Sequence, residues 1–293
     1  MFNGSFVALV TPFTGQGEID FSSLGRLVDF HLQQGSNGLV IAGTTGESVS
    51  LSQAEFCAVL DHVVAQVSGR IPVIAGTGSA STQRSVEQTQ LAAAHGADAA
   101  LVVTPYYNRP VQRGLEAHFR AIADESVIPI ILYNVPSRTA VDMLPETVAR
   151  LSEHERIVGI KEAVADVGRV RQLLELCGES FVVLSGDDNS CLEAMKNGAH
   201  GVISVAANVV PGPFAQLCVA ARRQEWSRAD ELDFSLRKLF DILMIETNPI
   251  PVKWALFEMS LLGPHIRLPL MRLGEEFREP LRQCLQQLEL IPA

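Results

Sequence analysis

Short apolar segments recur along the first two-thirds of the chain, and each is followed by an amphipathic stretch. The segments are rich in Val, Ile and Leu without polar alternation, which is typical of strands buried on both faces of a parallel sheet. They are Phe6–Val10, Gly38–Ala42, Pro72–Ala75, Ala99–Val103, Pro129–Tyr133, Ile157–Lys161, Phe181–Ser185 and Gly201–Ser204. Eight evenly spaced strand–helix units predict an α/β protein with a TIM (β/α)8 barrel. An open, doubly wound sheet is the alternative.

The helical stretches predict the rest of the architecture. One begins at Ser52 with Glu55 three residues later, a capping box in which the two residues satisfy each other's backbone donors. After residue 224 the apolar strands stop, and three helices are predicted over residues 227–245, 249–260 and 274–289. We therefore expect a catalytic barrel over 1–224 and a C-terminal helical domain over 225–293, packed on it as an appendage.

Composition excludes several classes of protein. The 293 residues are 47% hydrophobic and carry a net charge of −10 without any cluster of Lys and Arg, so neither nucleic acid nor an anionic membrane surface is an expected partner. The five cysteines are scattered and form no Cys-x-x-Cys pair, and the histidines lack metal-binding spacing. We expect no metal, no secretion signal and a cytoplasmic protein with free thiols.

A lysine occupies a position where lysine is unexpected. Lys161 closes the apolar run Ile157–Ile160, and burial there would disfavour its charged ammonium form. A neutral amine is a nucleophile toward ketones and forms a Schiff base with them. Another strand ends in Tyr133, a phenol able to transfer protons beside that amine. The pair indicates imine chemistry, although Lys161 can equally reach from the strand end into solvent.

Further polar residues follow the predicted strands at their carboxyl ends, where TIM barrels place their chemistry. The turn Gly43-Thr44-Thr45-Gly46 offers hydroxyls and backbone N–H groups that can hold a carboxylate, or it is simply a tight turn that needs glycine. Arg138 can bind a substrate carboxylate through two parallel hydrogen bonds, or it can form a surface ion pair. Gly76-Thr77-Gly78 begins like a dinucleotide-binding motif, but Ser81 replaces its third glycine, so NAD binding is not expected.

Four motifs together resemble those of the dihydrodipicolinate synthase family of pyruvate-dependent class I aldolases. They are Gly43-Thr44-Thr45-Gly46-Glu47, Thr104-Pro105-Tyr106-Tyr107, Tyr133-Asn134-Val135-Pro136-Ser137-Arg138-Thr139 and Gly159-Ile160-Lys161-Glu162-Ala163. The resemblance runs from Ala8–Phe13 to Asn248–Lys253, which is nearly the whole chain. It implies a reaction in which pyruvate condenses with L-aspartate 4-semialdehyde to give 4-hydroxy-tetrahydrodipicolinate.

The resemblance also implies a role for each matching residue. Lys161 would form the pyruvate imine, and Tyr133 would relay protons with Thr44 and with a Tyr107 borrowed from a neighbouring subunit. Thr45 would hold the pyruvate carboxylate and Arg138 that of the semialdehyde. Backbone carbonyls of Gly186 and Ile203 would shape the floor of the site. The implied protein is a homo-oligomer, a dimer or a dimer of dimers (homotetramer), that uses no cofactor.

Two other functions compete with this one. N-acetylneuraminate lyase and the keto-deoxy sugar-acid aldolases share the lysine, the tyrosine and the barrel. Arg138 and the Thr44–Thr45 turn favour the synthase over both. A barrel that has lost catalysis and only binds or regulates is the other alternative, but Lys161, Tyr133 and Arg138 are all present.

Feedback control is where the chain departs from the family's pattern. Members inhibited by L-lysine bind it in a cleft at a subunit interface, and Ser48 and Tyr106 match that cleft. The positions that usually carry His, His, Asn and Glu are instead Gln53, Phe56, Ala80 and Arg84. Because Arg84 repels a cationic ligand, we expect L-lysine to inhibit weakly or not at all.

Overall fold

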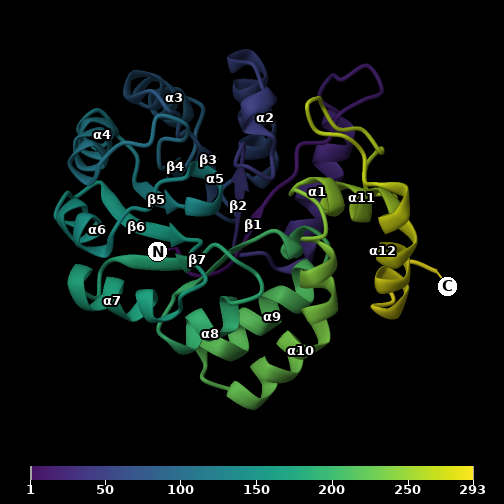
Figure 1. Ribbon diagram of the computed structural model, residues 1–293. Helices are drawn as coiled ribbons and strands as arrows, with labels where there is room; N and C mark the ends of the chain where they lie inside the picture. Colours follow the sequence, from purple (N-terminus) through teal and green to yellow (C-terminus); the bar gives the residue numbers. More distant parts are fainter. Residues whose placement is uncertain (1, 293) are drawn as a thin grey trace.

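The protein is described by a computed structural model over residues 2–292. In this range eight parallel strands pair in chain order and the last pairs with the first, so the sheet closes into a barrel (Figure 1). The strands are β1 Gly4–Ala8, β2 Gly38–Ile41, β3 Val73–Gly76, β4 Ala99–Val103, β5 Ile130–Asn134, β6 Ile157–Glu162, β7 Val182–Ser185 and β8 Gly201–Ser204. The predicted TIM barrel is therefore confirmed, and the open sheet is wrong.

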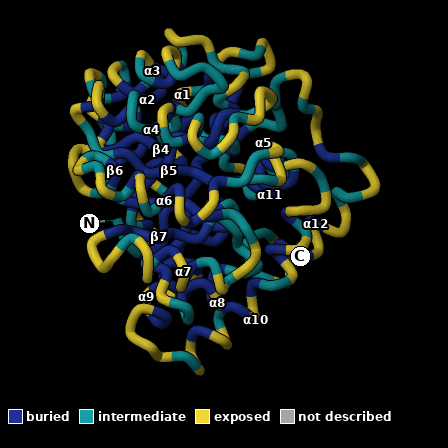
Figure 2. The backbone as a smooth tube through the Cα atoms, turned by 60° about the vertical axis from the view of Figure 1, so that its left-hand side comes forward, coloured by how far each residue is buried: buried dark blue, intermediate teal, exposed yellow. Residues whose placement is uncertain are grey.

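The strands face two apolar clusters, as their continuous hydrophobic character predicts. Residues such as Phe6, Val40 and Ile74 pack together inside the barrel with Tyr133. Their neighbours, such as Val7 and Leu39, pack outward against the helices. Figure 2 shows the strands as the buried centre of the molecule and the exposed residues on its periphery. The alternation of side chains thus buries both faces of every strand.

Helices follow the strands and surround the barrel (Figure 1). They are α1 Phe21–Gln34, α2 Gln53–Val67, α3 Thr82–Ala94, α4 Gln112–Asp124, α6 Pro145–Ser152, α7 Gly168–Cys177, α8 Cys191–Lys196 and α9 Pro211–Arg222, with a short α5 at Pro136–Thr139 and 3₁₀ turns at Ser48–Ser50 and Ala206–Asn208. The capping box of α2 is confirmed, because Ser52 and Glu55 exchange both hydrogen bonds. Among the described helices, none has the length and apolar character needed to cross a membrane.

The first strand lies two residues earlier than predicted. Leu9 still donates its backbone N–H to Val40 at 2.9 Å, but the N–H of Val10 is donated to the side chain of Asn208 at 3.1 Å. A side-chain amide thus replaces the strand ladder at Val10. The end of β1 is therefore tied to the turn that follows β8, which the apolar pattern alone does not predict.

Three helices follow residue 224 in the described chain, as expected. They are α10 Trp226–Ile242, α11 Ile250–Glu258 and α12 Glu275–Gln287. Helix α10 packs on α9, and α12 packs on both α10 and α11 at one side of the barrel (Figure 1). The division into domains 1–224 and 225–293 stays a prediction, and residue 293 lies outside the described range.

Candidate active site

Lys161 and Tyr133 are register partners on adjacent strands. The pairing of β5 with β6 places Tyr133 opposite Lys161, and the lysine Nζ lies 4.5 Å from the centroid of the tyrosine ring. The lysine is only 5% exposed, so it does not extend into solvent. Among residues 2–292 this ring is the only polar or aromatic partner of the Nζ atom. A buried amine without a carboxylate partner is well placed for nucleophilic chemistry.

The two side chains line a cavity of about 120 Å³ at the carboxyl ends of the strands. This is smaller than the roughly 300 Å³ at which pockets for drug-sized ligands begin, so the cavity suits a small substrate. Six residues predicted for the site line it together: Thr44, Thr45, Tyr133, Arg138, Lys161 and Gly186. The structure thus brings together residues that are up to 142 positions apart in the chain, from Thr44 to Gly186.

The cavity is apolar at its floor and polar at its rim. Ala8, Val40 and Leu101 contribute the apolar lining from inside the barrel. Thr45 is buried, whereas Arg138 lies at the rim in α5 and donates to the backbone carbonyl of Asn248 at 3.4 Å. A ligand carboxylate held by Arg138 would therefore lie nearer solvent than one held by Thr45.

Gly186 is necessary for the lysine to fit. A Cβ atom at this position would lie 2.9 Å from Cε of Lys161 and 2.8 Å from Cβ of Ala163. Real Cβ atoms do not approach other heavy atoms this closely, so any larger residue would displace the lysine side chain. The contact gives Gly186 a steric role beside the predicted backbone one.

Two predicted site residues lie outside this cavity. Ile203 is buried in the apolar cluster inside the barrel, in contact with the group that contains Tyr133. Tyr107 is 94% exposed and has a positive φ of 72° in the loop after β4. An exposed aromatic side chain is available to a second subunit, and its role across an interface stays a prediction.

The model of the Dihydrodipicolinate synthetase family matches residues 1–288 of the chain. The chain belongs to this family. A 4-hydroxy-tetrahydrodipicolinate synthase of Pseudomonas aeruginosa is 54% identical over 287 residues, which cover 98% of each protein. The family predicted from the four motifs is confirmed.

Solved structures of the family match the fold as a whole. The dihydrodipicolinate synthase of Aquifex aeolicus has a TM-score of 0.97 at 46% identity, with 99% of each chain covered. A chloride-inhibited dihydrodipicolinate synthase of Acinetobacter baumannii, complexed with pyruvate, has a TM-score of 0.98 at 46% identity and covers 99% of this chain and 100% of its own. The helical tail is therefore part of the shared architecture.

One residue of that tail lines the cavity that contains Lys161, although the sequence did not predict it as a site residue. Asn248, between α10 and α11, lines the cavity and donates from Nδ2 to the Thr45 hydroxyl at 3.0 Å. Because Thr45 accepts this bond, its own O–H proton is free to be donated to a ligand. The two residues are 203 positions apart, so no local pattern could connect them.

Two further carboxylates line the cavity beside Gly186. Asp188 accepts from the backbone N–H groups of Val205 and Ala206 at 3.1 and 2.8 Å, and burial raises the pKa of its carboxyl. Asp187 accepts from the N–H and hydroxyl of Ser190. Both aspartates therefore fix the loops after β7 and β8. Their position after a predicted strand was the signal that could have identified them.

The glycines of the rejected dinucleotide motif have a structural role in this barrel. A Cβ on Gly76 would lie 2.2 Å from the carbonyl oxygen of Ala42, and one on Gly78 would lie 2.3 Å from the backbone nitrogen of Val103. Close packing of neighbouring strand ends therefore accounts for both glycines.

Proposed function

We propose that this protein condenses pyruvate with L-aspartate 4-semialdehyde to give 4-hydroxy-tetrahydrodipicolinate, the step that leads to diaminopimelate and lysine. The observation that carries the proposal is the buried Nζ of Lys161, 4.5 Å from the ring of Tyr133 in a small cavity. The high identity to 4-hydroxy-tetrahydrodipicolinate synthases supports it, and it does not favour the sugar-acid aldolases or N-acetylneuraminate lyase.

The reaction begins on the lysine itself. The amine of Lys161 adds to the ketone carbon of pyruvate, and loss of water leaves an imine. A proton then leaves the pyruvate methyl group, and the electron pair of that C–H bond forms the enamine. We assign the proton transfers to Tyr133, whose ring lies against the amine, with Thr44 beside it in the cavity. No cofactor is needed, because the imine itself accepts the electrons.

The second half of the reaction forms the new carbon–carbon bond. The enamine carbon attacks the aldehyde carbon of the semialdehyde, whose oxygen takes up a proton. The amine of the product then displaces Lys161 from the imine carbon, which closes the ring and regenerates the free lysine. We assign the pyruvate carboxylate to Thr45 and the semialdehyde carboxylate to Arg138, since a guanidinium binds a carboxylate with two parallel hydrogen bonds.

The active form is proposed to be a cytoplasmic homo-oligomer, at least a dimer. Tyr107 is exposed on each chain, and a phenol from a neighbouring subunit can extend the proton relay only in an assembly. Sedimentation combined with an activity assay tests this proposal. Activity should fall in parallel with dissociation, and fully active monomers at high dilution would contradict it.

Borohydride trapping tests the reaction. Incubation with pyruvate and borohydride should add one reduced pyruvate per chain, at Lys161 by mass spectrometry. A coupled assay should then show consumption of aspartate semialdehyde and not of sugar aldehydes. An adduct on another lysine would refute the mechanism, and turnover of a sugar aldehyde alone would refute the substrate.

A further inference from the structure

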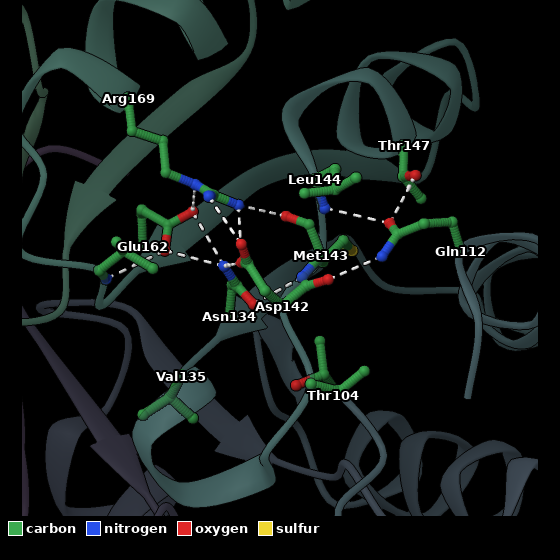
Figure 3. Close-up of polar contacts among 12 residues, drawn as sticks. Thr104, Gln112, Asn134, Val135, Asp142, Met143, Leu144, Thr147, Glu162 and Arg169 are labelled. Atoms are coloured by element: carbon green, nitrogen blue, oxygen red, sulfur yellow. Dashed lines mark hydrogen bonds and ion pairs between the residues drawn. The ribbon is translucent and has the colours of Figure 1, made fainter. Parts of the chain in front are cut away.

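A closed polar network, drawn in Figure 3, begins one residue beyond the Lys161–Tyr133 pair on strands β5 and β6. One step further along the same two strands, Asn134 is the register partner of Glu162. Successive residues of a strand face opposite sides of a sheet, so the first pair faces the cavity and the second faces the helices. Asn134 is 0% and Glu162 is 3% exposed. The Asn134–Glu162 pair is thus buried between the barrel and its helical layer, whereas Asp142 is partly exposed.

The network satisfies its members almost completely. Asn134 donates from Nδ2 to both carboxylate oxygens of Glu162, at 3.0 and 3.2 Å, and to Asp142 at 2.8 Å. Its Oδ1 accepts from the backbone N–H of Met143 at 3.0 Å. Arg169 closes the ring by donating from Nε to Glu162 at 2.9 Å and from Nη1 to Asp142 at 3.0 Å. The four side chains come from β5, β6, α7 and the segment between α5 and α6, as Figure 3 shows.

The network contains more acidic groups than basic ones. Glu162 and Asp142 are two carboxylates that share the single guanidinium of Arg169. Burial raises the pKa of Glu162 to about 7, against the lowering effect of Arg169. The register partner of Glu162 on β7 is Ser185, which carries no charge, and Lys161 precedes it on β6. Burial thus opposes the negative charge of Glu162, whereas the hydrogen bonds from Asn134, Arg169 and the backbone N–H of Val164 favour it.

We propose that Asn134, Glu162, Arg169 and Asp142 form a positioning network that holds Lys161 against Tyr133 for proton transfer. The proposal rests on the proposed function. Each strand end is held by the residue that directly follows the reacting one, so a change in the network moves both reacting groups relative to each other. A misplacement of about 1 Å can lower a rate about 10²-fold. None of the four residues lines the cavity, so their effect on the substrates is indirect and passes through the neighbouring lining residues Tyr133, Val135, Lys161 and Ala163.

The variant Glu162→Gln tests this directly, because it keeps the shape of the side chain and removes its charge. We expect kcat to fall about 10- to 100-fold while the KM for pyruvate changes less than threefold. The wild-type profile of kcat against pH should contain a transition near pH 7, and the variant should lack it. The matched control is Glu116→Gln, which removes a carboxylate that accepts from Arg150 at 2.8 Å on the surface, and it should leave kcat and the profile unchanged.

Asp142→Asn is the second variant, because its side chain is partly exposed and its loss is less disruptive to folding. It should also lower kcat, but by a smaller factor than Glu162→Gln does. A kcat within twofold of wild type in folded Glu162→Gln would overturn the proposal. A lower kcat with an unchanged pH profile would also overturn it, since that result describes a purely structural role. Failure of the wild type to form a pyruvate adduct on Lys161 would instead refute the proposed function.

Discussion

Among the described residues two lysines are buried, and their hydrogen-bond partners differ although each Nζ atom lies over an aromatic ring. Lys161 is 5% exposed, and among residues 2–292 the ring of Tyr133 is the only polar or aromatic partner of its Nζ atom. Lys253 in α11 is 4% exposed, but its Nζ donates to Glu47 at 2.5 Å and to the carbonyl oxygen of Thr11 at 2.9 Å. Burial lowers the pKa of Lys253, and Glu47 opposes that effect.

The difference distinguishes a lysine in a structural ion pair, Lys253, from a lysine proposed to react, Lys161. Lys253 has a carboxylate and a carbonyl as partners, so its charge is compensated and it joins the helical tail to the turn that carries Thr44 and Thr45. Lys161 has no such partner among the described residues, and its environment leaves the amine free to react. Burial alone therefore does not distinguish the two lysines, but a carboxylate partner does.

Exchange of each lysine for methionine should therefore affect different properties, activity for Lys161 and stability for Lys253. Lys161→Met should have the largest effect on activity. We expect a folded protein whose turnover is lower by on the order of 10⁴-fold or more, because the covalent nucleophile is lost. A steady-state coupled assay with circular dichroism as the folding control measures it. Substantial turnover in this variant would remove the basis for contrasting the two lysines.

Tyr133→Phe should have the next largest effect. It retains the ring against Lys161 and removes only the hydroxyl, so stability should change little. Positioned acid–base groups contribute about 10²- to 10⁴-fold in rate, and kcat should fall by a factor in that range. Stopped-flow measurement of proton exchange at the pyruvate methyl group checks the assignment. Near wild-type exchange would show that the phenol does not transfer the proton.

Lys253→Met should instead destabilise the protein. It leaves the Glu47 carboxylate buried without its partner, which typically costs about 3–5 kcal/mol of unfolding free energy. Urea denaturation measures the loss. The double variant Lys253→Met/Glu47→Gln removes both charges and should be closer to wild type in stability than the single variant. A single variant as stable as wild type would mean that the ion pair is not structural.

The strand pattern of the sequence predicted where the candidate site residues at strand ends lie, but it did not predict side-chain partners that are far apart in the chain. Lys161, Tyr133 and the Thr44–Thr45 turn stand at the ends of apolar strands, so the recurring strand–helix pattern placed them at one end of a barrel. Asn248 and Lys253 belong to the tail, and their partners Thr45 and Glu47 are more than 200 positions away. Periodicity describes which face of an element is buried, but not which distant side chain meets it. The network around Glu162 was missed for the same reason.

Arg138→Ala should have a smaller effect that is confined to the second substrate. Loss of a charge-assisted hydrogen bond costs roughly 1.5–3 kcal/mol, or about 10- to 100-fold in kcat/KM for aspartate semialdehyde. Formation of the pyruvate adduct should be nearly unchanged, because Arg138 lies at the rim of the cavity and Lys161 at its base. Equal loss for both substrates would assign Arg138 a structural role.

The smallest expected effect is the response to free L-lysine, which should inhibit weakly or not at all. Ser48, Gln53, Phe56, Arg84 and Tyr106 line one cavity of the chain, and its role as a lysine cleft at a subunit interface stays a prediction. Lys253 shows what a buried ammonium group binds in this protein, namely a carboxylate and a backbone carbonyl. Glu55 is the nearby acid, but Arg267 donates to both of its oxygens and lowers the pKa of Glu55 to about 2.

The carboxylate of Glu55 is therefore already neutralised by the tail, and Arg84 adds a positive charge to the cleft itself. Each lost polar contact weakens binding by about 1 kcal/mol, so several together lower the affinity by orders of magnitude. Titration of L-lysine to millimolar concentrations in the coupled assay measures the response, with Arg84→Glu as the matched variant that should gain sensitivity. Inhibition of the wild type below millimolar concentrations would show that the cleft holds a cation without a free carboxylate.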